Sequence, residues 1–193
     1  MKTLIINCYL NKPEEKIQNY VNLIEGYGTF SIVRDKDIKL GDVDYDAVII
    51  SGSERFVSRG ELNPKLFRYM NDVDIPLLTI CYSHQILGIL HGCEVTHKNR
   101  VKGPVEIEII DNSEIFDGFG KKAVFDENHA EYVVYNRDLF DAELKLLARS
   151  NSSIVEAMRT RGRPHYGVQF HPERSGKNGK ELIRNFYRYV VKK

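Results

Sequence analysis

The feature that most constrains this fold is a repeated order, within residues 1–93, of a short apolar run followed by a helix-like pattern. The apolar runs cover residues 3–7, 46–51 and 75–80. Short apolar runs bounded by turn residues are typical of strands buried on both faces of a parallel sheet. Apolar residues at helical spacing follow these runs, near residues 13–24, 64–70 and 83–90. This alternation predicts a parallel sheet with helices packed against it.

The pattern changes in the second half of the chain. Residues 105–110 alternate apolar and polar side chains, as expected for a strand with one exposed face. Further strand-like segments follow around residues 124, 132–135, 144–148, 154–158 and 166–170. Asn178 and Glu181 have the spacing of a capping box, which predicts the start of a C-terminal helix. We predict one α/β domain over residues 1–193, with a central mixed, mainly parallel, flavodoxin-like sheet flanked by helices.

Composition excludes several classes of function. The chain has 28 Lys and Arg residues against 27 Asp and Glu residues, a formal net charge of +1. Such a balance gives no electrostatic footprint for nucleic acid or an anionic membrane. No apolar run approaches the roughly 18 residues that a membrane helix requires. The 3 cysteines are too few for a disulfide framework, so we predict a cytoplasmic protein with reduced thiols.

Cys81 lies where an apolar strand is predicted to end and a helix to begin. In open α/β sheets, ligands bind at the carboxyl ends of the strands. The positive end of the following helix dipole favours the thiolate, which is the nucleophilic form of cysteine. A lone cysteine in an apolar segment is more often a core residue, but polar side chains follow Cys81 immediately, at 83–85. This switch favours a nucleophile at the edge of the sheet.

His171 and Glu173 follow a second apolar strand, residues 166–170, with Pro172 between them. In an extended segment, residues two apart lie on the same face. A carboxylate beside an imidazole fixes its tautomer and stabilises the imidazolium, as in a catalytic triad. An isolated His-Pro-Glu is more often structural, so the interpretation depends on its coincidence with Cys81. Together the three residues supply a nucleophile, a base and an orienting carboxylate.

The two segments 76–87 and 166–173 resemble the motifs of the class I, or triad, glutamine amidotransferases, and the resemblance extends nearly end to end. Within that family, residues 105–109, 115–118 and 147–173 are most similar to the glutaminase portion of GMP synthases, in particular the separate glutaminase chain of two-subunit archaeal enzymes. The resemblance implies that Cys81 attacks the side-chain amide of glutamine. It also implies that His171 serves as acid and base and that Glu173 orients it.

The same resemblance implies further site residues and a partner. The oxyanion hole is matched by the backbone N–H groups of Gly52 and Tyr82, and substrate contacts are matched by Gln85, Asn128 and His129. No cofactor is expected in this chain. The ammonia is expected to pass to an ATP-pyrophosphatase synthetase subunit, which would hold ATP and magnesium.

The chain departs from the family pattern at the glycines around the nucleophile. Thr79 and Ser83 stand where the family usually has glycine on either side of the cysteine, and Ser53 replaces the second glycine of an early pair. These substitutions leave open a non-catalytic, amidotransferase-like binding module. The glutaminase subunit of another pathway, such as anthranilate synthase, and a free-standing γ-glutamyl hydrolase are further alternatives.

A metal site is the remaining alternative from the residues themselves. Five residues of ligand type lie within 17 positions: Cys81, His84, His91, Cys93 and His97. Structural zinc sites usually pair their ligands in two compact knuckles, whereas residues 84–92 have a helical pattern. We therefore expect no metal in this chain.

Overall fold

The structure, a computed structural model, describes residues 1–41, 44–112 and 114–192. These residues form one nine-stranded sheet in the order β2-β1-β3-β4-β9-β8-β7-β5-β6. The strands are β1 (Lys2–Asn7), β2 (Thr29–Arg34), β3 (Ala47–Ile50), β4 (Leu77–Ile80), β5 (Val95–Ile109), β6 (Lys122–Val133), β7 (Leu144–Arg149), β8 (Ala157–Thr160) and β9 (His165–Val168). The helices are α1 (Pro13–Ile24), α2 (Pro64–Asp72), α3 (Tyr82–Leu90), α4 (Arg137–Ala142) and α5 (Gly176–Asn185), which continues as a π-helix over Phe186–Val191.

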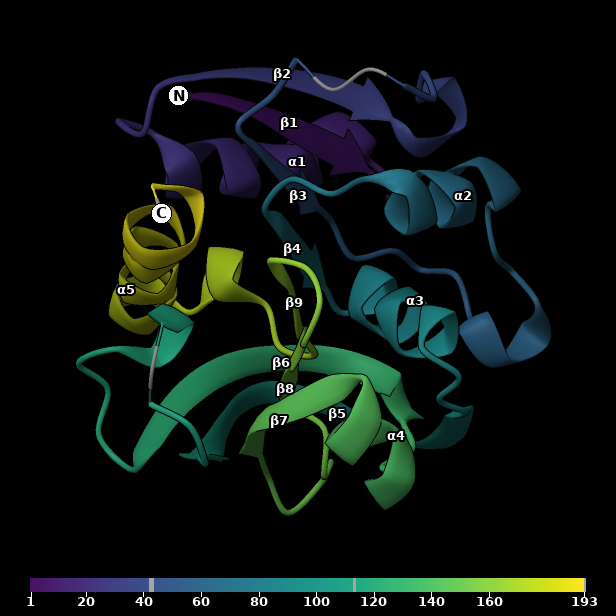
Figure 1. Cartoon of the computed structure of the whole chain (residues 1–193), viewed down its shortest axis with the longest axis vertical. Coiled ribbons are helices and arrows are strands. Elements are labelled where there is room, and N and C mark those ends of the chain that lie inside the picture. The colour runs from purple at the N-terminus through teal and green to yellow at the C-terminus, as the bar shows by residue number, and fades with distance from the viewer. Residues whose placement is uncertain (42–43, 113, 193) are drawn as a thin grey trace.

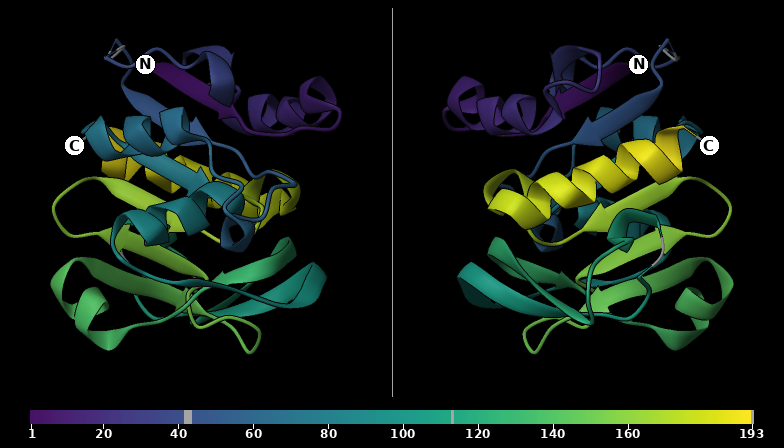
Figure 2. Two further views of the ribbon diagram at one scale, coloured as in Figure 1. Left: turned by 90° about the vertical axis from the view of Figure 1, so that its right-hand side faces the viewer. Right: turned by 90° about the vertical axis from the view of Figure 1, so that its left-hand side faces the viewer.

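The predicted parallel half of the sheet is confirmed. Strands β2, β1, β3, β4 and β9 are all parallel to their neighbours within this half, and every residue of β3 and β4 is buried. Alternate side chains of these strands enter two separate apolar clusters. Helices α1 and α5 contribute to one cluster, and α2 and α3 to the other, so helices cover both faces (Figures 1 and 2).

The antiparallel half differs from its prediction in detail. β5 and β6 form one long ribbon, so the segments predicted at 124 and 132–135 belong to a single strand. Residues 97–100 of β5 are exposed and polar, and their pairing through backbone bonds leaves no periodic signal. β8 begins at Ala157 rather than at residue 154, and the short helix α4 was not predicted.

The C-terminal helix begins at Gly176, and the predicted capping box is wrong. Ser175 occupies the cap position without a side-chain hydrogen bond to the helix. The Asn178 amide instead donates to the Val124 carbonyl, 2.9 Å away, which ties the helix to β6. In the described ranges, no helix combines the length and the apolar character needed to cross a membrane.

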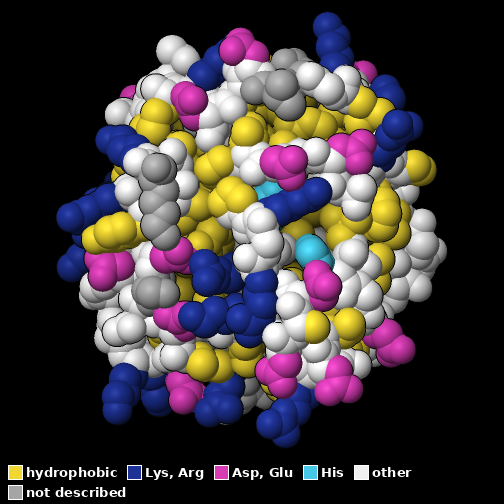
Figure 3. Space-filling model, viewed as in Figure 1, with side chains coloured by type: hydrophobic (Ala, Val, Ile, Leu, Met, Phe, Trp, Pro, Cys, Tyr) yellow, Lys and Arg dark blue, Asp and Glu magenta, His cyan; other side chains and the backbone are white. Residues whose placement is uncertain are grey.

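Basic side chains gather on the face of the molecule shown in Figure 3. Three arginines lie at the β8–β9 connection, and each has a partner. Arg159 pairs with Glu114 at 2.8 Å and Arg163 with Asp74 at 2.9 Å. Arg161 donates to the carbonyl of Phe140 at 3.4 Å. These contacts explain the three arginines as the anchoring of a hairpin.

Candidate active site

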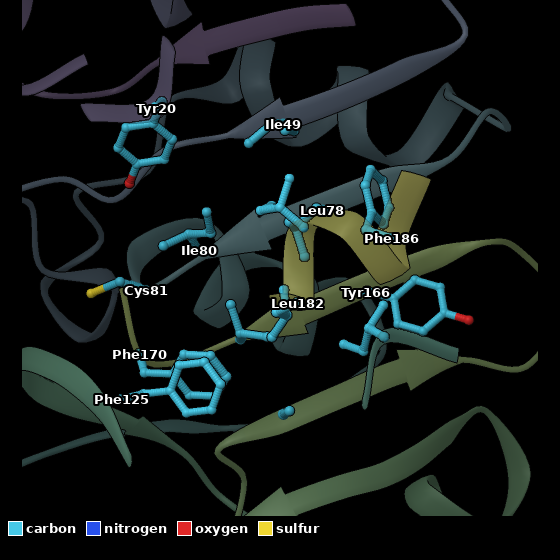
Figure 4. Packing of buried hydrophobic residues seen from close by; sticks show 14 of the residues in the cluster. Tyr20, Ile49, Leu78, Ile80, Cys81, Phe125, Tyr166, Phe170, Leu182 and Phe186 are labelled. Atoms are coloured by element: carbon cyan, nitrogen blue, oxygen red, sulfur yellow. The ribbon is translucent and has the colours of Figure 1, made fainter. Parts of the chain in front are cut away.

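Cys81 sits in a strained turn between β4 and α3. Its backbone has φ 54° and ψ −104°, a region that non-glycine residues rarely adopt. The turn is held on both sides, because the Cys81 N–H donates to the Val168 carbonyl at 2.8 Å and the Gln85 N–H donates to the Cys81 carbonyl at 3.1 Å. The side chain lies at the end of an apolar cluster, with its sulfur directed away from that cluster (Figure 4).

The residues that replace the family's glycines fit this turn. Ser83 is fully buried, and its hydroxyl accepts the Ile80 N–H at 2.8 Å and donates to the Ile50 carbonyl at 2.8 Å. Ser83 therefore links β3, β4 and α3 through one side chain. Thr79 donates from its hydroxyl to the carbonyl of Tyr166 in β9, 3.1 Å away. Polar side chains thus stabilise here a turn for which glycine usually supplies conformational freedom.

His171 and Glu173 form the predicted pair. His171 Nδ1 lies 2.7 Å from Glu173 Oε1, and both side chains are at most 5% exposed. The expectation of an extended segment is wrong, because Pro172 opens a 3-10 turn that runs through Arg174. The turn still brings the carboxylate to the imidazole, since Ser175 Oγ donates to the His171 carbonyl at 2.7 Å and closes it.

The electrostatics of His171 favour its protonated form. Burial disfavours the imidazolium, but the charge of Glu173 and the thiolate form of Cys81 outweigh it and raise the pKa of His171 to about 9. His171 Nε2 is buried and has no hydrogen-bond partner among the described residues. One nitrogen is therefore bound to the orienting carboxylate, and the other is available for proton transfer.

Gly52 lies between the nucleophile and the imidazole. A Cβ atom at this position would come 3.1 Å from His171 Cε1 and 3.5 Å from Cys81 Cβ, so only glycine fits without movement. Its N–H, predicted to serve an oxyanion hole, donates to the Tyr20 hydroxyl at 3.2 Å. Tyr82 is the first residue of α3, where a backbone N–H has no acceptor within the helix.

The three predicted substrate residues border the same site. Gln85 is buried, and its Nε2 donates to the Glu131 carbonyl at 3.0 Å. Asn128 Oδ1 is buried without a hydrogen-bond partner in the described part of the chain. His129 is engaged on both nitrogens, with Nδ1 at 3.0 Å from the Glu131 carbonyl and Nε2 at 2.8 Å from Glu127 Oε2. The ring of His129 is thus held by the protein itself.

Two adjoining cavities border the catalytic pair. One, about 40 Å³, is lined by residues that include Cys81, Gln85 and Asn128. The other, about 240 Å³, is lined by residues that include His171 and Asn128. Arg100, which sequence reasoning did not select, lines both cavities and therefore lies between them.

Sequence reasoning also missed three buried glutamates behind the site. Glu131 accepts the backbone N–H groups of Val57 at 2.6 Å and Ser58 at 3.0 Å, which fixes the loop that follows Gly52. Glu127 and Glu156 are fully buried beside His129. Burial and the charge of Glu127 hold the pKa of Glu156 well above its usual value. Nothing in a single sequence marks these acids as buried, because isolated glutamates are normally solvated.

The predicted alternative of a metal site at residues 81–97 finds no support in the geometry. Among the described residues, one set of His, Cys, Asp and Glu side chains can bring three ligand atoms within 4.8 Å of one another, and it is Glu127, His129 and Glu156. No three of the five predicted ligands, all of them described, come together in this way. His84 is instead fully buried in α3, where burial lowers its pKa to about 3 and keeps it neutral.

The family model of class-I glutamine amidotransferases matches residues 14–190 of this chain. The chain therefore belongs to the class-I glutamine amidotransferases, as the strained cysteine beside a buried His–Glu pair indicates. Among its relatives are archaeal proteins named as the first of the subunits of glutamine-hydrolyzing GMP synthase. That of Methanosarcina mazei is 36% identical over 145 residues, which are 74% of this chain and 72% of the relative. That of Methanothermobacter thermautotrophicus is 33% identical over 181 residues, 93% of this chain and 86% of the relative.

Solved structures show the same fold. A candidate GMP synthase subunit from Thermoplasma acidophilum superposes with a TM-score of 0.83 at 23% identity, over 100% of this chain and 98% of that one. A glutamine amidotransferase from Thermotoga maritima gives a TM-score of 0.71 at 18% identity, over 100% of this chain and 84% of that one. These similarities confirm the predicted α/β fold class with its mixed sheet.

Proposed function

We propose that this chain is the glutamine-hydrolysing subunit of a two-subunit GMP synthase. The observation that carries the proposal is the joint presence of the Cys81 turn and the buried His171–Glu173 pair in a chain whose archaeal relatives are glutamine-hydrolyzing GMP synthase subunits. Those relatives favour GMP synthesis over the other amidotransferase pathways. The intact triad geometry argues against a module that has lost catalysis.

In the proposed reaction, the Cys81 thiolate attacks the carbon of the glutamine side-chain amide and forms a tetrahedral intermediate. The imidazolium of His171 then gives its proton to the departing nitrogen, the C–N bond breaks, and ammonia leaves. The γ-glutamyl thioester that remains is attacked by water, and His171 takes a proton from this water. Collapse of the second intermediate releases glutamate and restores the Cys81 thiolate.

The negative oxygen of each intermediate requires N–H donors. Tyr82 can provide one from the start of α3, where the helix dipole also favours negative charge. Gly52 can provide the other only if the oxyanion replaces the Tyr20 hydroxyl as its acceptor, because the two are bonded at 3.2 Å in this structure. We therefore assign Gly52 and Tyr82 to the oxyanion hole, with Tyr20 as the group that is exchanged.

The ammonia needs an acceptor on a second chain. We propose a synthetase subunit of the ATP-pyrophosphatase class, which would hold ATP and magnesium and transfer the ammonia to XMP in the cytoplasm. This chain itself would hold no cofactor. The names of the archaeal relatives support the division of labour, since each is described as one subunit of a glutamine-hydrolyzing enzyme.

Covalent capture with a glutamine analogue tests the proposed nucleophile. A diazoketone analogue of glutamine should add its mass once per chain, at Cys81, in the complex with the synthetase subunit. Peptide mass spectrometry locates the adduct, and Cys93, a second buried free thiol, is the internal control. Absence of labelling with the partner present would favour the non-catalytic alternative.

A further inference from the structure

We infer that Arg100 binds the α-carboxylate of glutamine and so selects a free amino acid as the substrate. The inference rests on the proposed glutaminase function and extends it to a residue that none of the motifs identifies. It begins from the position of Arg100, which lines both the cavity beside Cys81 and the cavity beside His171. Its side chain therefore borders the space where the far end of a bound glutamine must lie.

The conformation of β5 explains why Arg100 reaches this position. The pairing of β5 with β6 shifts register between His97 and Val101, so the strand is irregular at this point. Such bulges bend a strand and change the direction of its side chains. The bulge is anchored, because the Tyr132 hydroxyl donates to the Asn99 carbonyl at 2.7 Å. Arg100 is thus presented by a fixed segment of the sheet.

Charge pairing around the two cavities leaves Arg100 as the available group. Arg55 is bound to Asp35 at 2.6 Å, and Arg174 to Asp126 at 3.0 Å. The remaining charged side chains of the lining are likewise engaged: Lys16 with Glu54, Glu131 with backbone N–H groups, and Glu173 with His171. Within residues 1–41, 44–112 and 114–192, Arg100 has no recorded ion pair or side-chain hydrogen bond.

The chemistry of the substrate matches this unpaired cation. Glutamine carries a carboxylate and an ammonium on its α-carbon, at the end remote from the reacting amide. An arginine guanidinium binds a carboxylate through two parallel N–H···O bonds. Asn128 Oδ1, buried and without a partner in the described chain, is an acceptor beside it for the ammonium. An amide substrate without the α-carboxylate would leave the guanidinium unsatisfied.

The test compares two substrates in the complex with the synthetase subunit. The substrates are glutamine and glutaminamide, in which the α-carboxylate is replaced by a neutral amide. For Arg100→Gln we expect KM for glutamine to rise at least about tenfold, since a hydrogen bond to a charged group is lost, with kcat changed less than about threefold. The same variant should hydrolyse glutaminamide as wild type does, and Arg100→Lys should recover part of the affinity.

Lys102→Gln is the matched control, because Lys102 is an exposed cation on the same strand that lines neither cavity. Its KM for glutamine should stay near the wild-type value. Equal losses on both substrates, or an unchanged KM for glutamine in Arg100→Gln, would overturn the inference while leaving the glutaminase function intact. A wild-type complex that hydrolyses neither substrate would instead contradict the proposed function, and the inference with it.

Discussion

His171 is the residue whose chemistry depends most on a single neighbour. Glu173 and the thiolate of Cys81 raise its pKa to about 9, so the ring stays protonated well into the alkaline range. Removing the carboxylate charge by Glu173→Gln should therefore lower the pKa of His171. We expect the alkaline limb of the kcat/KM profile for glutamine to move down by about one pH unit or more. We also expect kcat to fall about a hundredfold or more at neutral pH.

The measurement is a pH profile of glutamine hydrolysis in the complex. Glu181→Gln is the control, because Glu181 pairs with Arg184 on α5, outside the site, and the same chemical change there should leave the profile unmoved. A Glu173→Gln variant with the wild-type alkaline limb would show that the carboxylate does not set the protonation of His171.

Individual residues differ in how far the sequence reveals them. Cys81 and His171 could be selected because each follows an apolar strand at a point where polar residues take over. Arg100 and Glu131 could not, since the direction of the first depends on a register shift and the burial of the second on loop packing. A side chain whose role depends on long-range pairing leaves no local signal.

Among the elements, the β4–α3 turn carries the clearest adaptation of this chain. Ser83 joins three elements by its hydroxyl, with bonds to the Ile80 N–H and the Ile50 carbonyl. Ser83→Ala would leave these buried backbone groups without this partner. We expect the free energy of unfolding to fall by about 1–3 kcal/mol, as measured by denaturant titration.

Ser31→Ala serves as the comparison for that measurement. Ser31 lies on β2, is only partly buried, and has no side-chain hydrogen bond recorded in the described chain. Its substitution should change stability by less than about 0.5 kcal/mol. A Ser83→Ala protein as stable as the Ser31→Ala protein would mean that the hydroxyl does not hold the turn.

The elements of the first half could be predicted from sequence because each is a short-range pattern ended by Gly, Pro or polar residues. The β5–β6 ribbon could not be predicted as one unit, since its exposed portion lacks alternation and is formed by cross-strand backbone bonds. Glu173 is an instructive case between the two. Its contact with His171 was predicted from an extended geometry that does not exist, and a 3-10 turn produces the contact instead.

At the scale of the whole molecule, the sheet gathers a site from segments far apart in the chain. Gly52, Cys81 and His171 follow β3, β4 and β9, which are neighbours in the sheet although β9 comes last in sequence. Parallel strands end at one edge, so the three residues meet there as the strand order dictates. The fold class and the meeting of these residues could be predicted for this reason, whereas the identity of the acceptor of ammonia depends on a second chain.

The most direct test of the account compares two nitrogen sources for GMP formation from XMP and ATP by the complex of this chain with its synthetase subunit. With Cys81→Ala, glutamine-dependent synthesis should fall to background, because the thioester can no longer form. Synthesis from added ammonium salts should continue at the wild-type rate, because that step takes place on the partner. Glutamine-dependent synthesis that persists in Cys81→Ala would contradict the account.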